Sequence, residues 1–298
     1  IMLYKLFLNI ILYYMNTIII IIIGLIVLSI TYLSTKCTLN NFSNMLENFD
    51  NVDYFTNDYV NLYDNTFDYD DMYKNDIEII INKVIKNINN KDISILDAGC
   101  GLGKHLKYIY KKYNTIAIDR SKNMLNNAKK KCPNATFLLG DIINNNLFDS
   151  QSFNVIYSLL DSLYHNNQDN QIDIIKNFHS WLKPNGYLCV HIFNKNKLDP
   201  GPMPFTQYSD VNNINQAVTH FDDYSHIANF NIKDKHVEYN EIYERDGLDN
   251  LSHVTKLFID NKNNQIETIL SIGFKLIEVY SLKNIYIPDF ELYVFKKI

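Results

Sequence analysis

The sequence predicts an α/β fold built on a seven-stranded, mostly parallel sheet with helices on both faces. Short β-branched runs alternate with amphipathic helical segments from residue 93 to residue 193, as strands joined by crossover helices require. A glycine-rich turn follows the first of these runs, and an acidic residue ends the second. The chain of 298 residues, 47% hydrophobic and 20% charged, suits one large domain with additions.

The expected elements follow one another in a regular order up to residue 193. A helix over 77–88, with isoleucine and valine at helical spacing, leads into the core. The alternating segments then predict strands at 93–97, 115–119, 136–140, 153–160 and 187–193, and helices at 106–113, 122–131 and 172–182.

The pattern changes after Pro200. Consecutive segments with strand character predict an antiparallel insertion after the fifth strand, within residues 200–262, and Asp246 and Gly247 are expected to form one of its turns. A helix near 263–271 and two final strands complete the main sheet. The expected strands are 216–221, 225–232, 235–244 and 252–260 in the insertion, and 274–282 and 290–297 at the end of the chain.

The first part of the chain is expected to anchor the protein in a membrane. Residues 17–33, TIIIIIIGLIVLSITYL, carry no charge, and a helix that spans a bilayer needs about 20 apolar residues. A buried helix is the alternative, but such a helix normally keeps a polar stripe and this one has none. We therefore expect an N-terminal transmembrane helix within an anchor at 1–38. Lys5 and Lys36 lie on its two sides and leave its orientation open.

Residues 39–75 mix acidic and aromatic side chains without a clean period. This composition predicts a tether followed by short helical pieces, ahead of a main domain at 76–298. Tyr63, Tyr69 and Tyr73 either close over a ligand of the main domain or dock on its surface.

Charge and cysteine content narrow the class of partner. The formal net charge of -5 gives no general electrostatic reason to bind nucleic acid, so a nucleic-acid substrate is disfavoured. The four cysteines are widely scattered and form no CxxC pair. Cys189 and His191 share one face of a predicted strand, but two ligands do not make a zinc site, and no metal is expected.

The strongest signal for function is the segment ILDAGCGLGKH at 95–105. It follows a predicted strand and opens a predicted helix, which places its glycines at the edge of the sheet where parallel α/β folds bind ligands. A dinucleotide fingerprint requires a third glycine where Lys104 stands. A phosphate-binding P-loop requires glycine at Ala98 and serine or threonine at His105. Both nucleotide motifs therefore lack a required residue.

Acidic residues end the next two predicted strands. Asp119 can accept hydrogen bonds from both hydroxyls of a ribose, or it can cap the following helix, a role that Ser121 would fill as well. Asp141 can receive the exocyclic amine of an adenine while Ile142 packs on the ring, or it is a turn residue after Gly140.

The series ILDAGCGLGKH, AIDRSKNML, LLGDI, FNVIYSLLDSLYH and WLKPNGYLCV resembles the class I S-adenosylmethionine-dependent methyltransferases, which have a Rossmann-like fold. The resemblance covers about 76–298 and is most specific at 95–141. It implies S-adenosylmethionine as cofactor and a compact, small-molecule acceptor. The membrane segment departs from the soluble members. The residues that it implies at the cofactor are Asp97, Gly99, Gly101 and Gly103 at the methionine end, Asp119 at the ribose, Asp141 and Ile142 at the adenine, with Cys100, Arg120 and Ser158 completing the set.

The acceptor side is less specific. Asp161 and His165 in DSLYH are the best placed for a general base, because this segment follows the fourth strand and should line the methyl side of the cofactor. Capping and surface roles are the alternative for both. The loop KLDPGPMPF and the strands at 216–260 are expected to shape the acceptor pocket, with Tyr208, His220 and His226 as unranked candidates.

Two other functions stay open at this point. A Rossmann-type NAD(P)-dependent oxidoreductase has a similar strand order and the same acidic residue after the second strand, but the absent third glycine disfavours it. A non-catalytic scaffold that binds S-adenosylmethionine would keep the same site. Because S-adenosylmethionine is made in the cytosol, we expect a single-pass membrane protein whose catalytic domain faces that side.

Overall fold

The computed structural model describes residues 55–89, 92–193, 195, 216–281 and 291–298. Its main sheet has seven strands in the order β10-β11-β5-β4-β1-β2-β3. Strands β1 to β5 run parallel, whereas β11 is antiparallel to both β5 and β10. The mostly parallel seven-stranded sheet that the sequence predicts is confirmed. The strands are β1 Ser94–Ala98, β2 Asn114–Asp119, β3 Thr136–Leu139, β4 Phe153–Ser158, β5 Leu182–His191, β10 Phe274–Ser281 and β11 Glu291–Lys297.

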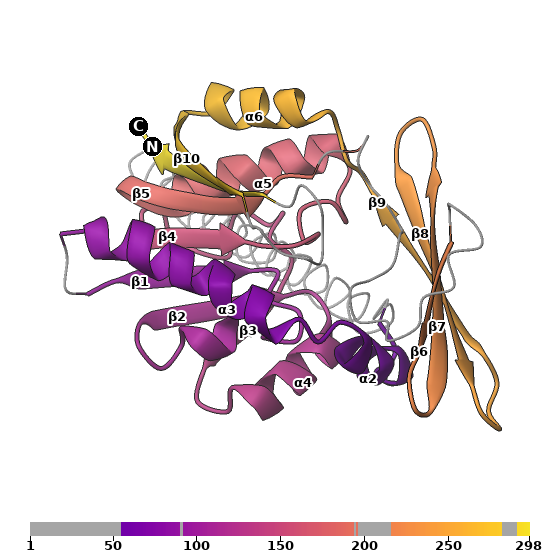
Figure 1. Ribbon diagram of the computed structural model, residues 1–298. Helices are drawn as coiled ribbons and strands as arrows, with labels where there is room; N and C mark the ends of the chain where they lie inside the picture. Colours follow the sequence, from indigo (N-terminus) through magenta and orange to yellow (C-terminus); the bar gives the residue numbers. More distant parts are fainter. Residues whose placement is uncertain (1–54, 90–91, 194, 196–215, 282–290) are drawn as a thin grey trace, which may run out of the picture. The chain divides into compact units, whose positions relative to one another are not determined.

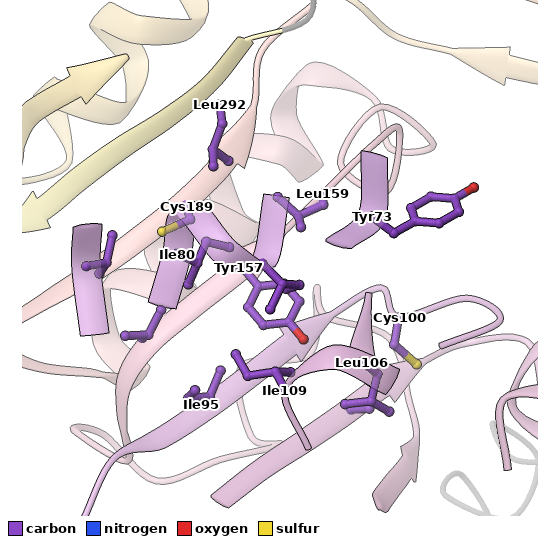
Figure 2. Packing of buried hydrophobic residues seen from close by; sticks show 14 of the residues in the cluster. Tyr73, Ile80, Ile95, Cys100, Leu106, Ile109, Tyr157, Leu159, Cys189 and Leu292 are labelled. Carbon is purple, nitrogen blue, oxygen red and sulfur yellow. The ribbon is translucent and has the colours of Figure 1, made fainter. Parts of the chain in front are cut away.

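Helices cover both faces of this sheet (Figure 1). On one face, α3 (Asp70–Ile79) continues through a π turn (Ile80–Val84) and a 3-10 turn (Ile85–Asn87). Its buried side chains share a core with Ile95, Cys189 and other residues of the central strands, and Figure 2 shows Tyr157 of β4 within that core. On the other face, α5 (Gln168–Trp181) and α6 (Lys262–Ser271) pack on the alternate residues of the same strands.

The helix expected at 106–113 is absent, and this prediction is wrong. A single 3-10 turn, Leu106–Tyr108, is followed by further turns. Leu106 and Ile109 are both fully buried and lie three residues apart, so a turn with that period is enough to bury both side chains. The glycines that precede it have positive φ angles, which end the strand abruptly and start no helix.

The insertion after β5 is an antiparallel sheet in the order β6-β7-β8-β9, as expected. The β8–β9 turn contains Gly247 at φ +71°, a conformation that favours glycine. This sheet contacts the main domain directly, since the Phe258 amide donates to the Tyr164 carbonyl at 2.8 Å. Its strands are β6 Gln216–His220, β7 Tyr224–Ile232, β8 Val237–Arg245 and β9 Leu251–Leu257.

The segment before the main domain is helical from residue 57. Helix α2 (Asn57–Thr66) begins at a Thr56 cap, whose hydroxyl accepts from the Tyr59 amide at 3.3 Å. Helix α3 crosses residue 75, so the chain enters the core earlier than the expected boundary. Tyr69 and Tyr73 are buried and Tyr63 packs against the same core.

Other expectations fall outside the described residues. These are the anchor with its apolar run at 17–33, and the loop that contains Tyr208. Within the described part of the chain, no helix is both long and apolar enough to cross a membrane.

Candidate active site

Three glycines shape the turn after β1. Gly99, Gly101 and Gly103 have φ angles of +82°, +49° and +70°, which other residues rarely adopt. A Cβ on Gly99 would lie 2.6 Å from the Cβ of Ser162, so the turn there packs tightly against the next loop. A Cβ on Gly101 would meet nothing within 4 Å. Gly101 is therefore the point at which a ligand can approach the backbone.

Asp119 lies beside this turn. Its carboxylate accepts from the Gly101 amide at 2.8 Å and from the Ser121 amide at 2.9 Å. Ser121 caps α4 (Lys122–Lys131) through the Met124 amide, so the capping alternative for Asp119 is wrong. Burial raises the pKa of Asp119, although the two amides oppose that rise. The tips of β1 and β2 thus meet at one carboxylate.

Asp97, at the end of β1, is a buried carboxylate. Its Oδ2 has no hydrogen-bond partner among the residues that the structure describes. Burial raises the pKa of Asp97 to about 8; the charge of Asp119 adds to this rise and the Tyr157 hydroxyl opposes it. Ser158 Oγ at the end of β4 is likewise buried without a partner in the described part of the chain. Unfilled polar atoms of this kind fit a polar ligand at the strand ends.

Cys100 is buried beside Asp97. Burial raises the pKa of its thiol well above the ordinary value, and the nearby carboxylates add to that rise. The side chain therefore stays a neutral thiol, and its part in the predicted cofactor site is steric.

At the predicted adenine end, Asp141 and Ile142 already form contacts within the protein. Asp141 Oδ1 accepts from the Ile143 amide at 3.1 Å, as a turn residue does, and its Oδ2 lies 3.9 Å from Arg120 Nη1. Ile142 is buried in the core under α5, where Asn177 donates to its carbonyl at 3.0 Å. Arg120 and Asp141 keep partly exposed side chains. Their roles at an adenine stay predictions.

Asp161 and His165 form a pair on the loop after β4. His165 Nε2 lies 3.3 Å from Asp161 Oδ2. Burial raises the pKa of Asp161, but the contact with His165 outweighs it, so the carboxyl stays charged. Ser162 on the same loop donates to the Gly99 carbonyl at 3.0 Å. The predicted acid–base pair and the glycine turn are therefore neighbours.

A buried polar network occupies one face of the four-stranded sheet. Glu241 on β8 is 1% exposed; it accepts from Tyr59 at 2.7 Å and Tyr243 at 3.0 Å, and lies 3.1 Å from His226 Nε2. His253 faces Glu241 across the β8–β9 pair and stacks on Tyr59 at 4.0 Å. We define these five residues as the Glu241 cluster.

Phe55 links the Glu241 cluster to the acid–base pair, because its ring contacts both His253 and His165.

Of the unranked candidates, His226 belongs to the cluster, whereas His220 lies at the sheet edge and contacts Ser225. Glu241 was missed in the sequence, although a carboxylate flanked two residues away by Tyr239 and Tyr243 on one strand face was a usable signal.

Part of the chain is similar to a known protein family. A methyltransferase domain family model matches residues 95–186, which begin in β1 and end within β5. Residues 95–186 therefore correspond to a methyltransferase domain. S-adenosylmethionine is the cofactor that this domain uses, which favours a methyltransferase over the oxidoreductase alternative.

Curated relatives match parts of the methyltransferase domain. Phosphoethanolamine N-methyltransferase of Plasmodium falciparum is 29% identical over 158 residues, which are 51% of this chain and 57% of that protein. A dTDP-3-amino-3,4,6-trideoxy-α-D-glucopyranose N,N-dimethyltransferase of Streptomyces venezuelae is 29% identical over 33% of this chain and 41% of its own. The chain spans about half the length of the curated relatives it matches.

Solved structures share the fold of the methyltransferase domain. An S-adenosylmethionine-dependent methyltransferase from Clostridium acetobutylicum has a TM-score of 0.63 at 19% identity, covering 81% of this chain and 98% of that one. CalS10, an amino pentose methyltransferase from Micromonospora echinaspora, has a TM-score of 0.60 at 14% identity and covers 76% and 92%.

Proposed function

We propose that the protein transfers the methyl group of S-adenosylmethionine to a small molecule. The observation that carries this proposal is the Gly101 amide bound to Asp119 at 2.8 Å, beside the unpartnered Asp97 Oδ2 and the open space at Gly101. Asp97 would receive the ammonium of the methionine end, and Asp119 the ribose hydroxyls. The same residues would serve a non-catalytic scaffold, so activity separates the two.

The chain's own residues have a limited chemical task. The cofactor supplies a methyl group already activated by its sulfonium. The protein must align a nucleophile in line with that methyl group and exclude water. The Asp161–His165 pair, adjoining the glycine turn through Ser162, is placed to hold or accept a proton of the acceptor.

The Glu241 cluster supports an amine as the acceptor. Glu241 is buried, and no lysine or arginine forms an ion pair with it in the described part of the chain. Burial and the charge of Glu241 raise the pKa of Tyr59 and Tyr243, which remain neutral donors. The carboxylate has two hydroxyls and an imidazole as partners but no lysine or arginine, and aromatic rings stabilise a nearby cation. Both features favour an ammonium ligand, and two relatives are named as N-methyltransferases.

Methyl transfer to an amine releases a proton, and residues of this chain are available to hold it. The cofactor, when bound, would supply the methyl group, and the acceptor ammonium would give up a proton before its nitrogen can act as the nucleophile. The Asp161–His165 pair, beside the glycine turn, would hold that proton.

Transfer of labelled methyl from S-adenosylmethionine tests the proposal. The full chain in detergent is given phosphoethanolamine and, as the matched hydroxyl compound, 2-hydroxyethyl phosphate. We expect label on the amine and not on the alcohol. Glu241→Gln, which keeps the shape but removes the charge, should raise the amine KM at least tenfold without changing cofactor affinity. Label on the alcohol alone, or an unaltered KM, would exclude the amine; a screen of host-cell extracts in which no compound gains label would leave only the scaffold.

We also propose that residues 17–33 anchor the protein in a membrane, with the catalytic domain on the cytosolic side. The support is the uncharged apolar run of the sequence and the cytosolic supply of the cofactor. Carbonate extraction of membranes that contain the full chain tests this. Recovery in the pellet is expected, and recovery in the supernatant would contradict it.

A further inference from the structure

We propose that His191, oriented by Asp76, is a positioning residue that holds the loop Leu160–His165 in place for methyl transfer. This inference rests on the proposed function, because the loop carries the Asp161–His165 pair. His191 acts through the backbone of the loop and does not itself need to reach a substrate.

His191 contacts the loop near both of its ends. Its Nδ1 accepts from the Leu160 amide at 2.9 Å, and its backbone carbonyl accepts from the Tyr164 hydroxyl at 3.0 Å. The His191 side chain is completely buried at the carboxyl end of β5. One residue of a rigid central strand therefore fixes the start and the end of the loop.

The bond from Leu160 also fixes the imidazole tautomer. Since Nδ1 accepts a hydrogen bond, the ring hydrogen lies on Nε2, which is 3.6 Å from Asp76 Oδ2. Burial raises the pKa of Asp76, but the contacts with His191 and His105 outweigh it and lower the value, so Asp76 is ionised. An ionised carboxylate near Nε2 favours the tautomer that the loop requires.

The loop needs such a restraint because its backbone is unusual. Leu160 has a φ angle of +55°, in the left-handed region that leucine disfavours. This conformation turns the chain directly before Asp161. Strained residues of this kind persist where surrounding contacts over-determine them, and the His191 bond lies on the strained residue itself.

Asp76 extends the restraint to the cofactor side. The same Oδ2 lies 3.0 Å from Nε2 of His105, at the end of the glycine-rich motif. Asp76 is fully buried on α3, so the docking of this helix connects the cofactor turn with the loop of the acid–base pair. His105 and His191 are 86 positions apart in the sequence, and both lie beside this carboxylate.

Two variants of His191 separate positioning from folding. His191→Asn places an amide oxygen close to the position of Nδ1 and keeps an acceptor for the Leu160 amide. His191→Leu removes the acceptor at similar volume. Both are made in the full chain, and each is compared with wild type in hydrogen exchange by mass spectrometry, cofactor affinity and turnover of phosphoethanolamine.

We expect His191→Leu to speed exchange at least tenfold in peptides that span 159–165, and to lower kcat about 100-fold, the loss that a displacement of about 1 Å can cause. Peptides from β1 and β2 should be unchanged, cofactor affinity should stay within threefold, and His191→Asn should recover most of both losses. Asp76→Asn should show the same pattern more weakly, which keeps the test open if the leucine variant does not fold.

The hydrogen-exchange result and the methyl-transfer result distinguish failure of the His191 inference from failure of the proposed function. Faster exchange at 159–165 without any methyl transfer in wild type would refute the function and with it the role in positioning for transfer. Methyl transfer in wild type with unaltered exchange and kcat in the leucine variant would overturn the His191 inference alone. Equal losses in the asparagine and leucine variants would also overturn it.

Discussion

Replacement of Asp119 by alanine should weaken S-adenosylmethionine binding without unfolding the domain. Asp119 holds the Gly101 and Ser121 amides at 2.8 and 2.9 Å, so its carboxylate is fixed at the point where the two strand tips meet. Hydrogen bonds to a charged group contribute about 1.5–3 kcal/mol. The dissociation constant should therefore rise about 10- to 150-fold, since about 1.4 kcal/mol corresponds to a factor of ten.

Isothermal titration calorimetry on the full chain measures this change. Ser121→Ala is the matched control, because it removes the cap of α4 and leaves the Asp119 carboxylate in place. The control should lose about 1 kcal/mol of unfolding free energy and bind the cofactor as wild type does. The reasoning is refuted if Asp119→Ala binds within threefold of wild type, or if Ser121→Ala weakens binding as much.

The remaining predictions concern the same turn. Gly101→Ala is strained at φ +49°, but its Cβ has open space, so this variant should fold and lose at least tenfold in cofactor affinity. Gly99→Ala adds a Cβ 2.6 Å from that of Ser162 and should lower the thermal midpoint by several degrees more; equal midpoints for the two variants would contradict the geometry. Asp97 has a pKa raised to about 8, so the folded state binds more protons than the unfolded state between about pH 4 and pH 8. Its contribution to stability is therefore lost as the pH rises through that window, and cofactor-free wild type should lose more stability from pH 5 to pH 8 than Asp97→Asn; equal pH profiles in thermal melts would argue against a perturbed Asp97.

The strands were predictable because each follows from a local pattern. The observed β2, β4 and β11 begin within one residue of the positions expected from β-branched runs, and α4 coincides with its expected range. Glycine and acidic residues at the strand ends were equally readable, since a parallel sheet brings all such ends to one edge. The meeting of Gly101 with Asp119 follows from this rule.

The parts that sequence reasoning missed depend on contacts between distant segments. The helix expected at 106–113 has good periodicity, but the tertiary core needs only Leu106 and Ile109 from it. In the sequence, His191 is an ordinary residue of a predicted strand. Nothing local indicates that its ring nitrogen accepts a hydrogen bond from the Leu160 amide. Glu241 receives the Tyr59 hydroxyl only when α2 packs against β8, and it meets His226 only when β7 pairs with β8. Such roles arise from tertiary structure and leave little trace in local sequence.

The most direct test of the central claim is calorimetric titration of the purified full chain with S-adenosylmethionine and, separately, with NADH. Recognition of the methionine end by Asp97 and of the ribose by Asp119 predicts saturable binding of S-adenosylmethionine in the micromolar range and no heat from NADH. Tight binding of NADH together with no response to S-adenosylmethionine would contradict it.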